Sequence, residues 1–371
     1  MNVGFNGKPL FRRRYDMAKR VTMEMIARAC DTSIGTVDRA LNSRKGINAE
    51  TRQRIMDKAE ELGYRPNIMA SALSRNTDAR IAFIYPTNAH AFFSCITKGI
   101  QKAEAELSRY GIEIDYINTD PHDPASQLKL LEELDYDGYD AFAINPLSSK
   151  CTAFVDAIAD SGKPVALFNN DLPSSRRLFY VGTDNSQCGR IAGEIMGLIM
   201  QGEGAVTVLG NFVHIMPFYE RYEGFCEVIH DYYPNIDIFP SSDSRYEQDL
   251  VEKNIDKLLA SGAKKFGIFS TGYSCTEMAC RSVETRGRKD ITLVGCDVSD
   301  EIAEAVKKGW CKALLYQDPF QQGYQTAQLF ARNLLEGWVP EHSTLSIETR
   351  TVLRQNTVNY SGGILRRELF I

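Results

Sequence analysis

The segment VTMEMIARACDTSIGTVDRALNSRKGINAETRQRIMDKAEELGYRPNIMASAL, residues 21–73, decides how the first part of this chain folds. Thr22 is placed to cap one short helix, and the break Asp31–Ile34 offers a second hydroxyl cap before another. Asn48 is placed to cap a third helix, which Gly63 ends. Two short helices joined by so tight a turn are typical of the helix-turn-helix, whose second helix lies in the major groove of DNA.

The second helix carries side chains that we expect to contact DNA. Helical spacing places Ile34, Gly35, Asp38 and Arg39 on one face, and Arg39 is suited to bidentate contact with guanine. Asp38 either accepts a hydrogen bond from cytosine N4 or orients Arg39. We also assign Thr22 to the DNA-contacting surface. The residues expected to hold phosphates, which fix register without choosing bases, are Ser33, Thr36, Asn42, Tyr64 and Asn67.

The charge of the chain is unevenly distributed. Its formal net charge is -5, which argues against DNA affinity over the whole molecule. Residues 1–76 nevertheless carry 15 Lys/Arg against 8 Asp/Glu, a net of +7, whereas residues 77–371 carry 28 against 40, a net of -12. A basic first part followed by an acidic remainder confines phosphate attraction to the helix-turn-helix.

Other features of the composition bear on location and cofactors. Nine cysteines without a Cys-x-x-Cys pair predict free thiols in a reducing cytoplasm, and five separated histidines give no metal-ligand spacing. No apolar run approaches the roughly 18 residues of a membrane span. Residues 1–16 lack a secretory signal; they are either a basic disordered arm or, as we prefer, an extension ahead of a natural start at Met17. We therefore expect a cytoplasmic, nucleoid-associated protein with no metal or other cofactor.

From Ile81 onward, short apolar strands alternate with amphipathic helices such as 92–109. This order predicts doubly wound parallel sheets. There are too many units for one open sheet, so we expect two lobes, one near 78–180 plus 318–345 and one near 185–315 plus the C-terminal segment. The strand candidates are 81–85, 112–118, 140–145, 165–169, 205–210, 266–270, 292–296 and 312–316.

The residues directly after these strands indicate a binding site. In open α/β sheets, ligands bind beyond the carboxyl ends of the strands. Carboxylates, amides and an arginine between aromatic rings bind vicinal hydroxyls while the rings cover the apolar face of a sugar. The candidate effector-binding residues are Asn88, Phe92, Phe93, Asn145, Asn169, Asn170, Asp171, Arg221, Tyr273, Asp297 and Gln317.

The first part of the chain resembles the headpiece of the lac repressor (LacI/GalR) family. The residues that carry the resemblance are, in order, Val21-Thr22, Ala27, Thr36-Val37, Arg39, Leu41-Asn42, Thr51-Arg52 and Glu61–Asn67. It implies an all-α helix-turn-helix headpiece followed by an α/β two-lobed core like that of the ribose-type periplasmic binding proteins. It also implies a hinge over 66–77 that orders on operator DNA, with Ala70 and Leu73 at the DNA and Leu73 as a minor-groove wedge.

The resemblance also implies roles for individual residues of the core. Arg221 lies in an Arg-x-x-Gly-Phe motif like that of the sugar binders. The chain departs from the ribose-type sites at Asn169-Asn170, where they usually carry Asp-Arg, and at Tyr273, near their usual asparagine. These departures leave open a different sugar, a polyol, a sugar derivative or a non-sugar. The positions that match ligand contacts of the family are Phe92, Phe93, Arg221, Asp297 and Gln317.

The chain is thus expected to comprise a disordered extension over 1–16, a helix-turn-helix domain over 17–65, a hinge over 66–77 and an effector-binding and dimerisation domain over 78–371. The predicted function is that of a transcriptional repressor, a homodimer or higher oligomer, whose operator affinity changes when a sugar-like effector binds between the lobes. The alternatives are a regulator with a protein corepressor and one without a small ligand. A transport-associated binding protein has no use for the basic headpiece, and enzymatic activity is disfavoured because the Gly-x-Gly-x-x-Gly turn and the P-loop pattern are missing.

Overall fold

The computed structural model describes residues 21–41, 46–62, 78–87, 89–210, 216–239 and 247–366. The chain divides into two compact units, Met1–Ser71 and Ala72–Ile371. Several predictions fall outside the described residues: the contacts of Asn42, Tyr64, Asn67, Ala70, Leu73 and Asn88, the extension 1–16 and the hinge 66–77.

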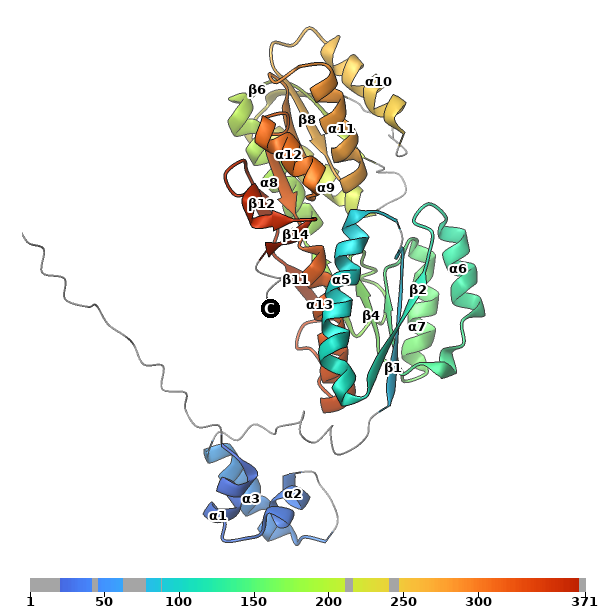
Figure 1. The fold of residues 1–371 in the computed structure, drawn as a ribbon, viewed down its shortest axis with the longest axis vertical. Helices are drawn as coiled ribbons and strands as arrows, with labels where there is room; N and C mark the ends of the chain where they lie inside the picture. Colours follow the sequence, from blue (N-terminus) through green and yellow to red (C-terminus); the bar gives the residue numbers. More distant parts are fainter. Residues whose placement is uncertain are drawn as a thin grey trace, which may run out of the picture. The chain divides into compact units, whose positions relative to one another are not determined.

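Three helices lie in the described part of the first unit, residues 21–41 and 46–62 (Figure 1). α1 (Met23–Ala29) begins after Thr22 and α3 (Ala49–Glu61) begins after Asn48, and both of these side chains accept a hydrogen bond from a backbone N–H of the helix. α2 (Ile34–Leu41) lies between them in sequence. These bounds confirm the helix-turn-helix that the capping residues and spacing predict. The apolar core that holds the three helices together consists of Ile26, Ala27, Cys30, Val37, Ala40, Ile55 and Ala59.

The second unit contains two six-stranded sheets with the same strand order, β11-β5-β4-β3-β1-β2 and β12-β10-β9-β8-β6-β7. Each strand of one sheet therefore has an equivalent in the other. Among the described strands of these two sheets, the β10–β12 pair alone is antiparallel. This architecture confirms the predicted α/β two-lobed core. The first sheet contains β1 (Ala79–Tyr85), β2 (Ile112–Asn118), β3 (Ala141–Ile144), β4 (Val165–Phe168), β5 (Phe179–Thr183) and β11 (Thr344–Ile347); the second contains β6 (Glu203–Leu209), β7 (Asn235–Phe239), β8 (Phe266–Ser270), β9 (Thr292–Cys296), β10 (Ala313–Tyr316) and β12 (Arg350–Val352).

Helices surround each sheet and complete the two lobes (Figure 1). Lobe one is the first sheet with its helices, and lobe two is the second sheet with its helices. In lobe one the helices are α5 (Ala91–Leu107), α6 (Pro124–Glu133), α7 (Thr152–Asp160) and α13 (Pro319–Glu336); in lobe two they are α8 (Asn185–Met200), α9 (Met216–Tyr232), α10 (Gln248–Leu259), α11 (Tyr273–Thr285) and α12 (Asp300–Lys308).

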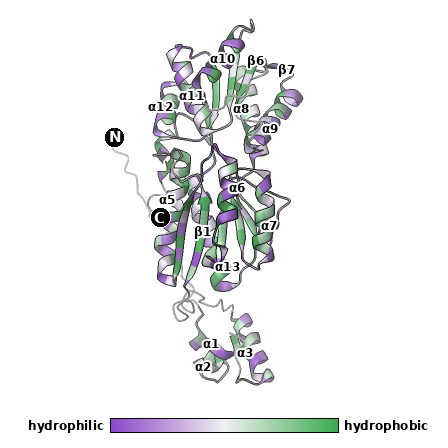
Figure 2. Ribbon diagram, turned by 90° about the vertical axis from the view of Figure 1, so that its right-hand side faces the viewer, coloured by the Kyte–Doolittle hydropathy of each residue, from purple (hydrophilic) through white to green (hydrophobic). Residues whose placement is uncertain are grey.

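The central strands are largely apolar because both of their faces are covered. In β1, Ile81 and Phe83 belong to the apolar cluster that contains α5 and α13, whereas Ala82 and Ile84 belong to the cluster on the opposite face. Figure 2 shows the same pattern as hydrophobic strands within more hydrophilic helices. In the described part of the chain, no helix combines the length and the apolar character that crossing a membrane requires.

The chain passes between the two lobes three times. It leaves lobe one after β5 and enters α8, returns after β10 into α13, and leaves again between β11 and β12. Three neighbouring connections of this kind form an inter-lobe hinge, distinct from the hinge segment 66–77, about which two lobes can open and close. The carboxyl ends of the parallel strands lie beside this hinge, so residues after the strands of both lobes are brought together.

A close approach of α8 and α9 fixes the position of Arg221. A Cβ atom at Gly189 of α8 would lie 2.0 Å from the backbone oxygen of Arg221 of α9. Only glycine allows the helices to approach this closely. The backbone of Arg221 is therefore seated directly on α8.

Candidate functional site

Residues that come directly after strands of both lobes line one cavity of about 90 Å³. Asn145 and Asn169 follow β3 and β4 of lobe one, and Asp297 and Gln317 follow β9 and β10 of lobe two. The full lining consists of His90, Phe92, Phe93, Pro121, His122, Asn145, Leu147, Asn169, Asn170, Pro217, Phe218, Arg221, Tyr273, Ser274, Asp297 and Gln317.

The two lobes turn their strands into the cavity in the same way. Asn169 and Asp297 occupy equivalent positions after β4 and β9, and both have left-handed backbone, with φ of 61° and 72°. Asparagine and aspartate are the non-glycine residues that adopt this region most readily. The abrupt change from extended backbone ends each strand at the cavity, and backbone of this kind is concentrated at functional sites.

Arg221 organises the floor of the cavity in lobe two. Its side chain is almost fully buried, at 2% exposure. Its Nε and Nη2 donate to Asn185 Oδ1 at 3.1 and 2.7 Å, and its Nη1 donates to the backbone oxygen of Thr271 at 2.6 Å. A further short hydrogen bond joins Nη2 to Gln317 Oε1. Four of the five guanidinium N–H groups are thereby used, so the plane of this group is fixed before any ligand arrives.

Asp297 is the acidic group of the cavity. Its Oδ1 accepts a hydrogen bond of 2.8 Å from Gln317 Nε2, so Gln317 bridges Asp297 and Arg221. Burial raises the pKa of Asp297 to about 6, although Arg221 and Gln317 act in the opposite direction. A carboxylate in this position is suited to accept hydrogen bonds from the hydroxyl groups of a ligand that excludes water from the cavity.

Three amide side chains form the opposite wall in lobe one. Asn169 Nδ2 donates to Asn145 Oδ1 and to Asn170 Oδ1, each at 3.3 Å, and Asn170 Nδ2 donates to the backbone oxygen of Pro146 at 2.9 Å. Asn145 is fully buried, and its Nδ2 has no hydrogen-bond partner within the described residues. This donor is therefore available to an acceptor atom of a ligand, and leaving it unpaired costs about 1–3 kcal/mol.

Aromatic side chains close the remaining sides of the cavity. The rings of Phe92 and Phe93 meet edge to face at 5.4 Å. His90 of lobe one and Tyr273 of lobe two stack in parallel, with ring centroids 4.9 Å apart. Burial, and to a smaller extent the charge of His122, lower the pKa of His90 to about 4. The His90 ring is therefore neutral at neutral pH and offers its flat face to the ring of Tyr273.

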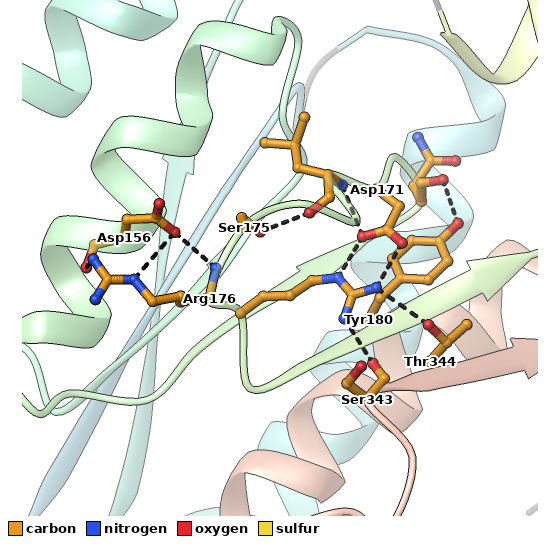
Figure 3. Close-up of polar contacts among 10 residues, drawn as sticks. Asp156, Asp171, Ser175, Arg176, Tyr180, Ser343 and Thr344 are labelled. Carbon is orange, nitrogen blue, oxygen red and sulfur yellow. Dashed lines mark hydrogen bonds and ion pairs between the residues drawn. The ribbon is translucent and has the colours of Figure 1, made fainter.

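Asp171 is a correction to the sequence-based prediction, because it does not line the cavity. Its carboxylate receives two hydrogen bonds, of 2.5 and 2.7 Å, from Arg177. Arg177 also donates to the backbone oxygen of Ser343 and to Thr344 Oγ1, which ties the pair to the start of β11. Figure 3 labels Asp171, Ser343 and Thr344, which these hydrogen bonds join through Arg177. The carboxylate is thus neutralised by a buried partner and holds β5 to β11, a structural role.

Sequence reasoning missed several residues of the cavity. Pro121 and His122 come after β2, and Ser274 comes after Tyr273 at the start of α11. Several of the other contacts, such as Asn145, Asp297 and Gln317, are predicted by reading the residues directly after each strand, and extending that rule a few residues beyond β2 would have found Pro121 and His122. Among the described residues, no three His, Cys, Asp or Glu side chains are arranged to hold a metal ion. The missed lining residues are His90, Pro121, His122, Leu147, Pro217, Phe218 and Ser274.

The first unit presents the predicted DNA-contacting residues on α2 and its capping turn. Ser33 Oγ accepts from the backbone N–H of Thr36 at 3.1 Å, and the Arg39 guanidinium reaches Thr36 Oγ1 at 3.4 Å. Arg39, Gly35 and Ile34 are exposed, and Asp38 is half-buried. Ile34 leaves 49% of its surface in solvent. The side chains of Arg39 and Ile34 are exposed on the face predicted to meet base edges, whereas Thr22 is engaged as the cap of α1.

Comparison with known proteins identifies the family of the chain. The family model described as "Bacterial regulatory proteins, lacI family" matches residues 22–67, and that described as "Periplasmic binding protein domain" matches residues 81–337. The chain belongs to the lacI family of bacterial regulatory proteins. It is a DNA-binding transcriptional regulator with a periplasmic-binding-protein-like core, as the motifs of its headpiece predict.

Relatives of this lacI-family regulator fall into two groups. The HTH-type transcriptional regulator DegA of Bacillus subtilis is 25% identical over 75% of this chain and 82% of the relative. The ribose import binding protein RbsB of Haemophilus influenzae is 26% identical over 68% of this chain and 84% of the relative. A solute-binding protein of an ABC transporter from Burkholderia graminis, solved in complex with D-arabinose, has a similar fold. It is 20% identical, with a TM-score of 0.69, over 77% of this chain and 99% of that chain.

Proposed function

We propose that this regulator is a repressor whose operator affinity is controlled by a sugar-like effector bound in the cavity between lobes one and two. The observation that carries the proposal is the chain Arg221–Gln317–Asp297 facing the unpaired donor of Asn145 across the cavity. Such a set offers donors from one arginine and one amide and an acceptor from one carboxylate, which matches neighbouring hydroxyl groups. The aromatic rings around it suit the apolar face of the same molecule.

The relatives support this chemical class. RbsB is named for ribose import, and the Burkholderia protein was solved with D-arabinose. The cavity has one fixed cation and one carboxylate, while Asn169 and Asn170 are neutral. We infer that the effector is an uncharged sugar or polyol. The charges of Arg221 and Asp297 already offset each other, so an ionised group on the ligand would be buried without a partner of its own. The residues assigned to its binding are Phe92, Phe93, Asn145, Asn169, Asn170, Arg221, Tyr273, Asp297 and Gln317.

We further propose that the regulator works as a homodimer in the cytoplasm and that it has no enzymatic activity. Two headpieces on one palindromic operator are the usual geometry for a helix-turn-helix protein. An effector that favours one arrangement of the lobes by about 1–3 kcal/mol changes operator affinity by about 5- to 150-fold. Sedimentation equilibrium of the full chain tests the dimer.

Thermal unfolding with a panel of ligands tests the effector. The panel contains D-ribose, D-arabinose, common hexoses and myo-inositol, each added to the full chain. A true effector at about 100 times its Kd adds about 2.7 kcal/mol of stability, and the Asp297→Asn variant should lose this gain. Gel shifts on genomic fragments with and without that ligand then show whether it releases or strengthens the DNA complex.

A panel without effect, combined with intact DNA binding, contradicts the sugar effector. That outcome favours the alternative of a protein corepressor or of a regulator without a small ligand. A chain that retards no genomic fragment, by contrast, contradicts operator binding itself.

A further inference from the structure

The C-terminal part of the chain forms a small hairpin with two different faces. β13 (Tyr360–Ser361) pairs antiparallel with β14 (Ile364–Leu365), with Tyr360 opposite Leu365 and Ser361 opposite Ile364. Successive side chains of a strand point to opposite faces. Ile364 and Leu365 therefore point in opposite directions, and both are buried.

The two faces of the hairpin pack on different lobes. Ile364 forms an apolar cluster with Cys95 of α5 and Phe320 of α13, both in lobe one. Tyr360 and Leu365 belong to the apolar core of lobe two. One residue step along β14 thus changes the lobe that the side chain contacts, and the hairpin bridges the two lobes close to β12 (Figure 1).

The turn of the hairpin is bonded to both lobes as well. The backbone N–H of Gly362 donates to Asp300 Oδ1 of α12 at 2.9 Å, and its backbone oxygen accepts from Cys95 Sγ at 3.3 Å. Asp300 belongs to lobe two and Cys95 to lobe one. The same residue therefore joins the beginning of α12 to α5.

Gly363 sits where no other residue fits. A Cβ atom at this position would lie 2.8 Å from the backbone oxygen of Val298 and 3.0 Å from Cys95 Sγ. Val298 directly follows Asp297, the carboxylate of the cavity. The hairpin therefore packs against the loop 297–300 at Val298, next to Asp297, which lines the cavity.

We propose that the hairpin 360–365 is a clasp that holds the loop 297–300 in place and joins it to lobe one, with Gly363 and Ile364 as positioning residues for the effector site. The function of the clasp rests on the proposed effector site. If the lobes separate, the hairpin cannot keep both Cys95 and Val298 as neighbours. Docking of the clasp and closure of the cavity therefore favour each other, by the reciprocity of linked equilibria.

The thiol of Cys95 reports on the clasp. It is 1% exposed beneath the turn, and burial raises its pKa to about 12. Alkylation requires an accessible thiolate, so Cys95 reacts only when the hairpin lifts. The experiment treats the full chain with N-ethylmaleimide at neutral pH and follows each cysteine by peptide mass spectrometry. Cys151, fully buried on the other face of the lobe-one sheet, reports general unfolding.

Two neighbouring glycines provide a matched pair of variants. Gly362 and Gly363 both have left-handed backbone, with φ of 54° and 80°, but a Cβ at Gly362 would meet nothing within 4 Å. Gly363→Ala is expected to raise the Cys95 alkylation rate at least tenfold, whereas Gly362→Ala leaves it within about twofold of the wild type. Backbone strain is common to both variants, so their difference isolates the contact with Val298 and Cys95.

Equal Cys95 rates in the two glycine variants overturn the clasp. If Gly363→Ala also raises the alkylation rate of Cys151, the variant has unfolded. The test then uses Ile364→Ala, which removes side-chain atoms and adds no bulk. This variant must raise the alkylation rate of Cys95 without raising that of Cys151, or the proposal fails. Hydrogen exchange over 296–300 must also become faster in Gly363→Ala or Ile364→Ala than in Gly362→Ala; an unchanged loop shows that the hairpin only packs. Neither measurement uses a ligand, so a failed clasp and a failed effector site give separate results.

Discussion

The imidazole of His90 and the phenol ring of Tyr273 lie parallel to within 6° across the cavity, with centroids 4.9 Å apart. His90 directly precedes α5 in lobe one, and Tyr273 is the first residue of α11 in lobe two. The stack therefore exists only while the lobes are closed. Aromatic pairs of this geometry contribute about 0.5–1.5 kcal/mol beyond the area they bury, enough to shift a balanced equilibrium between open and closed lobes several-fold.

The first prediction concerns the pH dependence of this contact. A base whose pKa is lowered on folding, here from 6.5 to about 4, contributes stability above pH 6.5 that is lost as the pH falls toward 4. At pH 5.5 His90 should lower the free energy of unfolding by about 1 kcal/mol. His90→Phe keeps a flat ring but removes the titration, so its advantage over the wild type should grow by about that amount between pH 7.5 and 5.5.

Urea unfolding at the two pH values measures this difference. His122 and Glu277 line the same outer edge of the site as His90 and remain in both proteins. His90→Ala, which loses the ring, should be less stable than His90→Phe at both pH values. If the free energies of unfolding of the wild type and His90→Phe change with pH in parallel, that result would falsify the lowered pKa of His90.

A second prediction is that Asp297→Asn stabilises the protein while abolishing effector binding. An acid whose pKa is raised on folding, here from 3.8 to about 6, destabilises the fold as the pH rises through that window, and fully so above pH 6. This value already includes the attraction of Arg221. The amide keeps an oxygen for Gln317 Nε2, so we expect a gain on the order of 2 kcal/mol at pH 7.5 that disappears near pH 4.

Chemical denaturation at pH 4 and 7.5 checks this second prediction. Asp290→Asn is the control, because the exposed Asp290 is bonded to Arg288 and its pKa is lowered rather than raised. That variant should give no stabilisation at either pH. If Asp297→Asn is no more stable than the wild type at pH 7.5, the partners of Asp297 fully offset the free-energy cost of burying its charge, and the prediction is wrong.

Most of the buried central strands could be predicted from sequence, whereas three of the four edge strands could not. The central strands β8 and β9 have the predicted bounds because an apolar run between two covered faces needs no knowledge of its neighbours. The edge strand β2 was also predicted with its exact bounds, whereas the edge strand β7 was missed because it is both short and half exposed. β5 was missed because no helix separates it from β4, which breaks the βα alternation on which the prediction relied.

The same limit explains the errors at the site. Arg221, Asp297 and Gln317 come together because parallel strands deliver their ends to one edge, a consequence of topology that sequence can supply. Asp171 was assigned to the ligand because its partner Arg177 lies at the entry to β5, the strand that was not predicted. His90 was missed because its place depends on the path of the loop after β1, which no periodicity encodes.

Arg221 is predicted to be a main determinant of the stability of lobe two as well as of binding. Arg221→Ala removes four hydrogen bonds and leaves Asn185, Gln317 and the Thr271 carbonyl group unpaired in a buried place. We expect a loss of about 3 kcal/mol or more in the free energy of unfolding. Arg190 on α8 is the control, because its side chain is 47% exposed and makes one contact with Glu227. Arg190→Ala should cost less than about 0.5 kcal/mol, and similar losses for both variants would show that the Arg221 network carries no special weight.

Sequence recognition by α2 is predicted to depend on Arg39. Its guanidinium is exposed and, among the described residues, is held by a 3.4 Å contact with Thr36 Oγ1, which it can give up at little cost to reach the O6 and N7 atoms of a guanine. Arg39→Ala should weaken binding to the selected operator by about 1–3 kcal/mol and reduce the preference at one base pair. Gel shifts at a fixed salt concentration, on the operator and on a set of single-base-pair variants, measure both effects.

Arg28→Ala is the matched control, since Arg28 lies on α1, is 81% exposed and pairs with Glu24. It removes the same charge without reaching a base, and should weaken all sequences equally and slightly, as loss of a general phosphate attraction does. If Arg39→Ala weakens binding to every sequence to the same extent, Arg39 contributes only a general attraction to phosphates. Base reading must then come from Ile34 or Asp38 on the same face of α2.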